Sequence, residues 1–261
     1  ARADDYPDAL LGAPLAAAKD APLLFSSGTT LPAETLAEIQ RVLAPGGLVI
    51  ILGGDSAVPA SIAAQVNALG YAQVRYSGAD RYATAVSVAD ALGDPKTVFL
   101  ATGTNFPDAL TAGPAATKTG DAILLTDGSA LPATTSAYLA AHTGQQDYAV
   151  GGPAAAAYPS ATPLVGADRY ATALAVLGQF YSSPQTMGLA SGASFADALA
   201  GGAFMSHVGG PLLLSDPNSL PSSVRTYLTE NAPPLVSLSI FGGTSAVSSS
   251  VQTAVGVALG Q

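Results

Sequence analysis

Short apolar runs alternate with longer amphipathic segments along the chain. The runs at residues 97–103 (TVFLATG) and 122–126 (AILLT) are nearly uninterrupted, as in strands covered on both faces. Residues 106–118 (FPDALTAGPAATK) lie between them and have the length and the early proline of a helix. Residues 78–93 are also predicted helical, and residues 147–152 (DYAVGG) form a predicted strand that ends at glycine. This alternation predicts βα units and a parallel sheet.

The same order of elements recurs earlier in the chain. Predicted strands at residues 22–25 (PLLF) and 48–54 (LVIILGG) alternate with predicted helices at 31–43 and 58–70, and residues 131–142 match the first of these helices.

Three landmarks show that one unit is used three times. They are a Pro/Ala-Asp-Ala-Leu tetrad, a Leu-Pro pair and a Gly-Gly pair, which begin at residues 7, 107 and 196, at 31, 131 and 220, and at 53, 151 and 242. The predicted units are residues 1–73, 74–163 and 164–261. Each is expected to be a small doubly wound α/β unit, flavodoxin-like or Rossmann-like, and the three are expected to pack with pseudo-threefold symmetry.

The three copies are unequal. The octad GADRYATA stands at residues 78–85 and 166–173, whereas copy one enters late, with Ala1 aligned to Ala101. Copy two is shortened after Gly152, where about two helical turns are expected to be missing. Residues 10–19 and 199–207 are rich in alanine and glycine, so we expect these helices at the contacts between copies.

Composition excludes several classes of protein. Hydrophobic residues make up 49% and charged residues 10%, and 9 Lys and Arg stand against 18 Asp and Glu, for a net charge of −9. A nucleic-acid binder needs a basic surface, which this chain lacks. No apolar run is long enough to span a membrane, and the opening residues do not resemble a signal peptide. The absence of cysteine excludes disulfides and thiolate zinc sites.

Motifs for nucleotide binding and nucleophilic catalysis are also absent. The sequence has no G-x-G-x-x-G, no G-x-x-x-x-G-K-[ST] and no G-x-S-x-G. His142 and His207 are the only histidines and occupy different places in their copies, so they are interpreted as solvated residues at helix ends. We therefore expect no catalytic residue, no cofactor and no metal site.

One aspartate recurs in every copy, as Asp8, Asp108 and Asp197. These carboxylates could act as general acids or bases. They could instead cap the helix that follows, by accepting hydrogen bonds from free backbone N–H groups. The capping interpretation is favoured, because a structural device is needed in each unit whereas an active site is usually built once.

The second recurring group is Asp-Arg-Tyr, at residues 80–82 and 168–170. Asp80 is a predicted N-cap, and Asp168 is its equivalent. Arg81 and Arg169 could lock helix to sheet by bonding a carboxylate or strand-end carbonyls. They could also grip an anion at the carboxyl ends of the strands, where open α/β sheets bind ligands. Tyr82 and Tyr170 could stack on a sugar or wedge the helix in place. The structural role is favoured for the arginines and for the tyrosines, and for the arginines both roles can coexist.

The ordered string GADRYATA, FPDAL, ILLT, LP and VGG resembles the cell wall binding repeat type 2, which occurs in threes on Gram-positive surface proteins, including S-layer-associated proteins and wall amidases. The resemblance covers nearly the whole chain. It implies a pseudo-trimer of α/β units, located outside the cell at the wall, that anchors a surface protein non-covalently to an anionic secondary cell wall polymer. It also implies a separate effector domain, which could lie upstream.

Two alternatives stay open beside this interpretation. One is a wall-associated hydrolase that uses the recurring aspartate, and the other is a structural surface protein that assembles with copies of itself. The acidic chain also admits a neutral wall polysaccharide as ligand. Only two of the three Asp-Arg-Tyr sites are complete within these residues.

Overall fold

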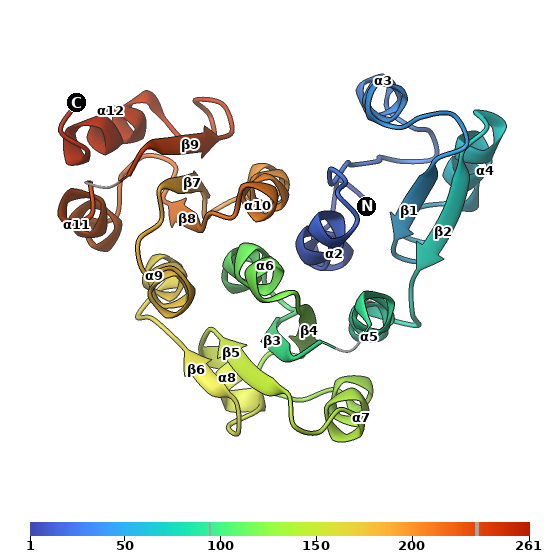
Figure 1. The fold of residues 1–261 in the computed structure, drawn as a ribbon, viewed down its shortest axis with the longest axis horizontal. Helices are drawn as coiled ribbons and strands as arrows, with labels where there is room; N and C mark the ends of the chain where they lie inside the picture. Colours follow the sequence, from blue (N-terminus) through green and yellow to red (C-terminus); the bar gives the residue numbers. More distant parts are fainter. Residues whose placement is uncertain (94, 233–234) are drawn as a thin grey trace.

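The computed structural model describes residues 1–93, 95–232 and 235–261 and shows three α/β units around a common centre (Figure 1). Unit 1 contains α1 (Pro7–Leu10), α2 (Gly12–Ala18), α3 (Ala33–Val42), β1 (Leu48–Leu52), α4 (Ala60–Ala68) and β2 (Ala72–Tyr76). Unit 2 contains α5 (Arg81–Leu92), β3 (Thr97–Thr102), α6 (Pro107–Thr119), β4 (Ala122–Thr126), α7 (Ala133–Ala141), β5 (Gln146–Val150), α8 (Gly152–Ala157) and β6 (Thr162–Leu164). Unit 3 contains α9 (Arg169–Phe180), β7 (Thr186–Ser191), α10 (Ala196–Val208), β8 (Leu212–Ser215), α11 (Ser222–Glu230), β9 (Ser237–Phe241) and α12 (Ser249–Ala258).

The strands of each unit pair in parallel, which confirms the predicted fold class. Their orders are β1-β2, β4-β3-β5-β6 and β8-β7-β9. The first strand of units 2 and 3 is therefore central, and the chain winds from it to both sides, as a doubly wound sheet does. Val98, Phe99, Leu100 and Ala101 of β3 are fully buried, which explains why this strand is apolar without interruption.

The prediction of a strand at residues 22–25 is wrong, because no strand forms there. In its place the structure has an irregular segment, which residues 1–2 contact through a hydrogen bond from the backbone nitrogen of Ala1 to the carbonyl of Leu24 and a parallel bridge between Arg2 and Ser26. The equivalent strand β4 pairs with β3 over five residues. Residues 22–25 have the right composition, but strand structure also requires a neighbour along the whole edge.

Three helices rich in small residues meet at the centre, as predicted. Helices α2, α6 and α10 contact one another pairwise. A Cβ added at Gly113 of α6 would lie 2.8 Å from Cβ of Ala13 in α2. The close approach of these backbones therefore depends on residues with little or no side chain.

Helices α5 and α9 join the units to one another. Helix α5 packs on β4 of its own unit and contacts β2 of unit 1, while α9 packs on β8 and contacts β6 of unit 2 (Figure 1). The predicted unit boundaries at residues 73 and 163 fall inside β2 and β6. These strands pair with β1 and β5, so unit 1 extends to Tyr76 and unit 2 to Leu164. Helix α8 has six residues where α4 has nine, so copy two keeps a shorter helix. Within the described ranges, no helix is both long and apolar enough to cross a membrane.

Candidate functional site

The Asp-Arg-Tyr group begins helices α5 and α9. Oδ1 of Asp80 accepts a hydrogen bond from the backbone N–H of Ala83 at 2.8 Å, and Oδ1 of Asp168 accepts one from Ala171 at 2.8 Å. Both aspartates are therefore N-caps, as predicted for Asp80. The caps hold the arginine and tyrosine that follow in the first helical turn.

The arginines bond strand-end carbonyls of their own unit. Nη1 of Arg81 donates to the carbonyl oxygen of Gly103 at 2.5 Å, and Arg169 makes the same bond to Gly192. A Cβ at Gly103 would lie 3.2 Å from Cδ of Arg81, so glycine leaves room for the arginine. The predicted lock between helix and sheet is confirmed, and ligand binding by these arginines stays a prediction.

The tyrosines face a loop that follows the next strand. Burial and a hydrogen bond to Asp127 raise the pKa of Tyr82 to about 12. Burial also raises the pKa of Tyr170, and the negative charge of Asp216 acts in the same direction. Both tyrosines therefore carry their proton at neutral pH. Their half-buried rings fit the predicted wedge between helix and loop.

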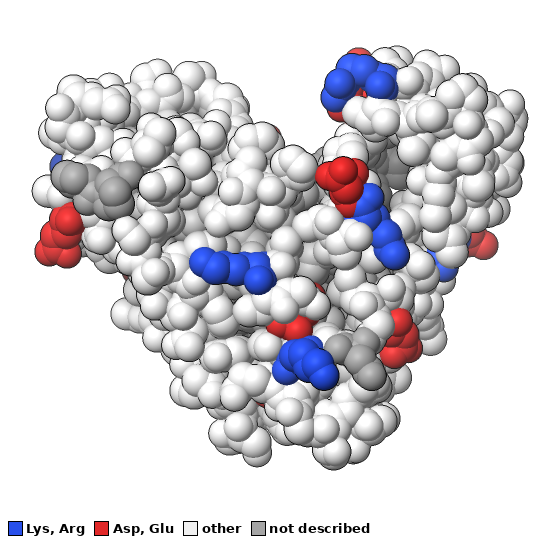
Figure 2. Space-filling model, viewed as in Figure 1, with Lys and Arg blue, Asp and Glu red and all other residues white. Residues whose placement is uncertain are grey.

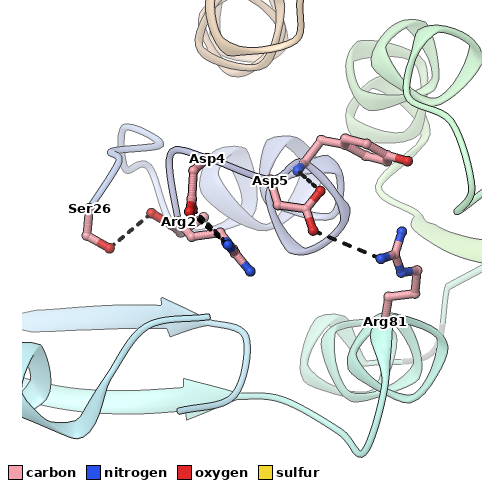
Figure 3. Close-up of polar contacts among 7 residues, drawn as sticks. Arg2, Asp4, Asp5, Ser26 and Arg81 are labelled. Carbon is pink, nitrogen blue, oxygen red and sulfur yellow. Dashed lines mark hydrogen bonds and ion pairs between the residues drawn. The ribbon is translucent and has the colours of Figure 1, made fainter. Parts of the chain in front are cut away.

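The two sites differ where they meet the preceding unit. Nη2 of Arg81 lies 4.0 Å from Oδ2 of Asp5 (Figure 3). The guanidinium carbon of Arg81 lies 6.0 Å from the centre of the Tyr6 ring. Asn105 takes the place of Asp5 at the junction of units 2 and 3. The junction at Arg81 therefore holds an additional carboxylate that the junction at Arg169 lacks.

The prediction that Asp8, Asp108 and Asp197 are N-caps is wrong. Their helices have Tyr6, Phe106 and Phe195 at the N-cap without a side-chain cap bond, and each aspartate lies inside the first turn. From there the carboxylates of Asp8, Asp108 and Asp197 lie against Gly53, Gly151 and Gly242, glycines with φ of +99°, +86° and +105°. A Cβ on Gly151 would lie 2.0 Å from Oδ2 of Asp108. The recurring Gly-Gly pair therefore makes room for the recurring aspartate.

Burial raises the pKa of Asp8 and of Asp108. The positive charge of Arg169 and a hydrogen bond from Thr172 oppose this shift at Asp108 without cancelling it. The native state therefore binds the proton more tightly than the unfolded chain does, and Asp108 lowers stability as pH rises from 3.8 through its raised pKa.

We expect Asp108→Asn to raise the urea midpoint at pH 7 and to leave it nearly unchanged below pH 3.8, because asparagine carries no charge at either pH. Asp168→Asn is the matched control, since it removes the same charge from a true N-cap, where asparagine is equally suited. A lower midpoint of Asp108→Asn at pH 7 would contradict the role assigned to burial.

Two recurring groups were missed by sequence reasoning. Asp127 and Asp216 recur beside the two tyrosines, in the loops after β4 and β8. Tyr6, Phe106 and Phe195 form a triangle of rings with centroids 5.5 to 5.7 Å apart, just ahead of the central helices. The signal was present in the sequence, because an aromatic residue lies two positions before each of the recurring aspartates.

Both histidines lie at helix ends, as interpreted from the sequence, but only His207 is exposed to solvent, whereas His142 is half-buried. His142 is the C-cap of α7 and stacks on Tyr138 at 4.0 Å between ring centroids. His207 lies in the last turn of α10, 3.5 Å from Asp20. Among the described residues, no group of three His, Asp or Glu side chains could hold a metal ion.

Comparisons with known proteins agree on the three-unit organisation. The family model described as cell wall binding domain 2 matches residues 1–63, 75–158 and 164–252. The chain is 30% identical over 252 residues to N-acetylmuramoyl-L-alanine amidase LytC of Bacillus subtilis, covering 94% of this chain and 50% of the relative. It is 25% identical to the amidase enhancer of the same species, covering 97% of this chain and 35% of the relative.

Two solved structures share the fold. Cwp8 from Clostridium difficile superposes with a TM-score of 0.85 at 25% identity, covering 97% of this chain and 45% of the other. Cwp6 from the same organism superposes with a TM-score of 0.86 at 23% identity, covering 97% and 43%. The chain therefore spans half or less of the length of these relatives.

Proposed function

The chain belongs to the cell wall binding domain 2 family, and from this premise we propose that it anchors a protein non-covalently to an anionic secondary polymer of the cell wall. A location at the wall follows from the same membership. The relatives are about two to three times longer than this chain, so an effector outside the matched region is part of the proposal. The binding sites are assigned to the Asp-Arg-Tyr groups at the junctions between units.

The arginines carry this assignment. Each guanidinium has five N–H donors, and the bond to the strand-end carbonyl holds the group in place while using one nitrogen. The side chain of Arg81 is 35% exposed, so other donors can reach a ligand. A guanidinium matches phosphate and carboxylate with two parallel hydrogen bonds, and the half-buried tyrosines beside it offer ring surface to a sugar.

The acidity of the whole chain does not prevent anion binding at such a site. Charges are screened over about 8 Å at physiological salt, so a nearby arginine outweighs distant carboxylates. The negative charge of Asp5 is near enough to Arg81 to weaken the binding of an anion there, whereas Asn105, its equivalent, carries no charge. We therefore propose that the junction at Arg169 binds the anion more tightly than the junction at Arg81.

Arg169→Gln is expected to lower retention on purified cell walls about tenfold, because it removes charge-assisted hydrogen bonds. Arg81→Gln is expected to lower retention less. Arg225→Gln is the matched control, because Arg225 is exposed on α11 and its substitution removes the same charge away from the proposed sites. Urea unfolding of each variant separates lost binding from lost structure, because both site arginines also bond carbonyls.

The same preparation tests the alternatives. Walls stripped of secondary polymer should retain little of the chain, and equal retention before and after stripping would reject polymer recognition. Release of soluble wall fragments that Asp108→Asn abolishes would support a hydrolase instead. Light scattering that rises with protein concentration in the absence of walls would support self-assembly.

A further inference from the structure

Three aromatic rings meet where the three units come together, ahead of the central helices α2, α6 and α10 (Figure 1). Tyr6 is the N-cap of α1, which leads into α2, and Phe106 and Phe195 are the N-caps of α6 and α10. Together these rings form the aromatic triangle. Each unit supplies one ring, so three copies of one position build a single feature.

The N-cap is an unusual position for these residues. It normally holds Ser, Thr, Asp or Asn, because a side-chain oxygen there satisfies free backbone N–H groups. Among the described residues, no side chain caps the three helices that begin at the triangle, although Asp80 and Asp168 cap other helices of the same chain. The aromatic residues therefore take the place of stabilising caps, and a second role is needed to explain them.

Packing alone does not explain the triangle. All three rings are half-buried, whereas an aromatic residue that only fills the core, such as Phe99, is fully buried. The cores also exchange volume between copies, since Gly188 is the equivalent of Phe99, but the triangle is aromatic in every copy. Ring contacts with centroids 5.5 to 5.7 Å apart hold it together, and part of it stays open to solvent.

The triangle lies beside the Asp-Arg-Tyr groups. The guanidinium carbon of Arg81 is 6.0 Å from the centre of the Tyr6 ring. The positive charge of Arg169 acts on Asp108, which lies in the first helical turn after Phe106. Both arginines are therefore near the same apolar surface, at the end where the central helices begin.

A sugar ring matches this combination of surfaces. The C–H groups on one face of a pyranose ring pack against aromatic rings, and an acidic substituent on the sugar forms paired hydrogen bonds with a guanidinium. Charge alone provides few contacts, because on the face in Figure 2 the Lys and Arg side chains stand apart on a mostly uncharged surface. A wall polymer therefore needs uncharged contacts as well, and the triangle offers them.

We propose that the aromatic triangle is a sugar-binding platform, on which one sugar ring of the wall polymer packs between the sites at Arg81 and Arg169. This proposal rests on the proposed function and adds the sugar itself to what the chain recognises. Salt screens the arginine contacts, whereas it does not weaken an apolar contact. The part of the binding that survives high salt therefore belongs to the triangle.

Phe195→Leu tests the platform, because leucine keeps an apolar side chain and removes the ring. We expect its apparent affinity for purified walls to fall about three- to tenfold, at low and at high salt. Phe195→Tyr keeps a ring of the kind that Tyr6 already provides and should bind like the unmodified chain. Phe204→Leu is the matched control, since it removes a ring that is 50% exposed on the same helix and contacts Phe241 instead. Urea unfolding of each variant measures any change in stability.

A second measurement leaves an aromatic ring in the triangle. The chain contains no tryptophan, so Tyr6→Trp places a single indole there. We expect its fluorescence to shift to shorter wavelength when soluble polymer, released from walls by digestion of the peptidoglycan, covers the ring. Tyr227→Trp, on α11, is the control and should not respond.

The outcomes separate this proposal from the proposed function. Equal wall affinity of Phe195→Leu and Phe204→Leu, or unchanged Tyr6→Trp emission with saturating polymer, overturns the platform, and a loss of retention by Arg169→Gln in the same assay leaves the proposed function standing. If stripped walls retain as much of the chain as intact walls, the anionic polymer is rejected. A salt-independent loss in Phe195→Leu then supports the platform as a site for a neutral wall glycan. No retention of the unmodified chain on any wall preparation overturns both proposals.

Discussion

Replacing Phe99 with alanine is expected to lower the free energy of unfolding by about 3–5 kcal/mol, the usual cost of removing a fully buried aromatic side chain. Phe99 lies in β3, and its ring stacks on Tyr148 of β5 with centroids 5.5 Å apart. It also meets Phe180 of α9 at 5.1 Å. The substitution therefore opens a cavity inside unit 2 and loosens the helix that joins it to unit 3.

Phe204→Ala is the matched control for this prediction. Phe204 is 50% exposed on α10 and contacts Phe241 at 5.7 Å between ring centroids. Its removal is expected to cost about 1 kcal/mol, mainly the ring contact. Urea unfolding followed by circular dichroism measures both variants. A loss below about 1 kcal/mol for Phe99→Ala would mean that the aromatic cluster does not hold the junction.

The repetitive part of the fold could be predicted because its sequence pattern occurs three times in the chain. Apolar strands, proline-initiated helices and the small residues of α2, α6 and α10 each recur at matching positions. The contents of the cores do not recur in this way. Phe99 has Gly188 as its equivalent, and the space is filled instead by Met205 and Phe241, which a Cβ at Gly188 would meet at 2.7 and 2.8 Å. Such exchanges of volume between elements leave no periodic signal.

The candidate site was predicted where the contacts are local. Asp80 and Asp168 cap their helices through residues three positions away, and such caps can be inferred from sequence. Asp108 shows where inference of caps from sequence fails. It resembles a cap in sequence but lies in the first turn of a helix that begins at Pro107. Its partner Gly151 is remote in the chain, so only the folded sheet brings the two together. Asp127 was missed for the same reason.

The glycine at the start of each GADRYATA octad is required for a steric reason. The backbone N–H of Gly166 donates to Oγ1 of Thr172 at 3.1 Å, so the chain folds tightly over the first turn of α9. A Cβ on Gly166 would lie 2.3 Å from both the carbonyl carbon of Ala171 and the nitrogen of Thr172. These are backbone atoms of a capped helix, which cannot move aside cheaply as the end of a flexible side chain could.

Gly166→Ala is therefore expected to cost about 3 kcal/mol of unfolding free energy, at the upper end of the usual range for overpacking, and to displace Asp168 and Arg169. Wall retention should fall at least as far as in Arg169→Gln. Gly178→Ala is the matched control in the same helix, because its added Cβ meets nothing within 4 Å. Alanine there should stabilise the chain by about 0.5–1 kcal/mol through helix propensity. If both variants unfolded at the same urea concentration, the steric origin of the glycine would be wrong. If Gly166→Ala lost stability but kept full wall retention, the anion would have to bind away from the Asp-Arg-Tyr turn of unit 3.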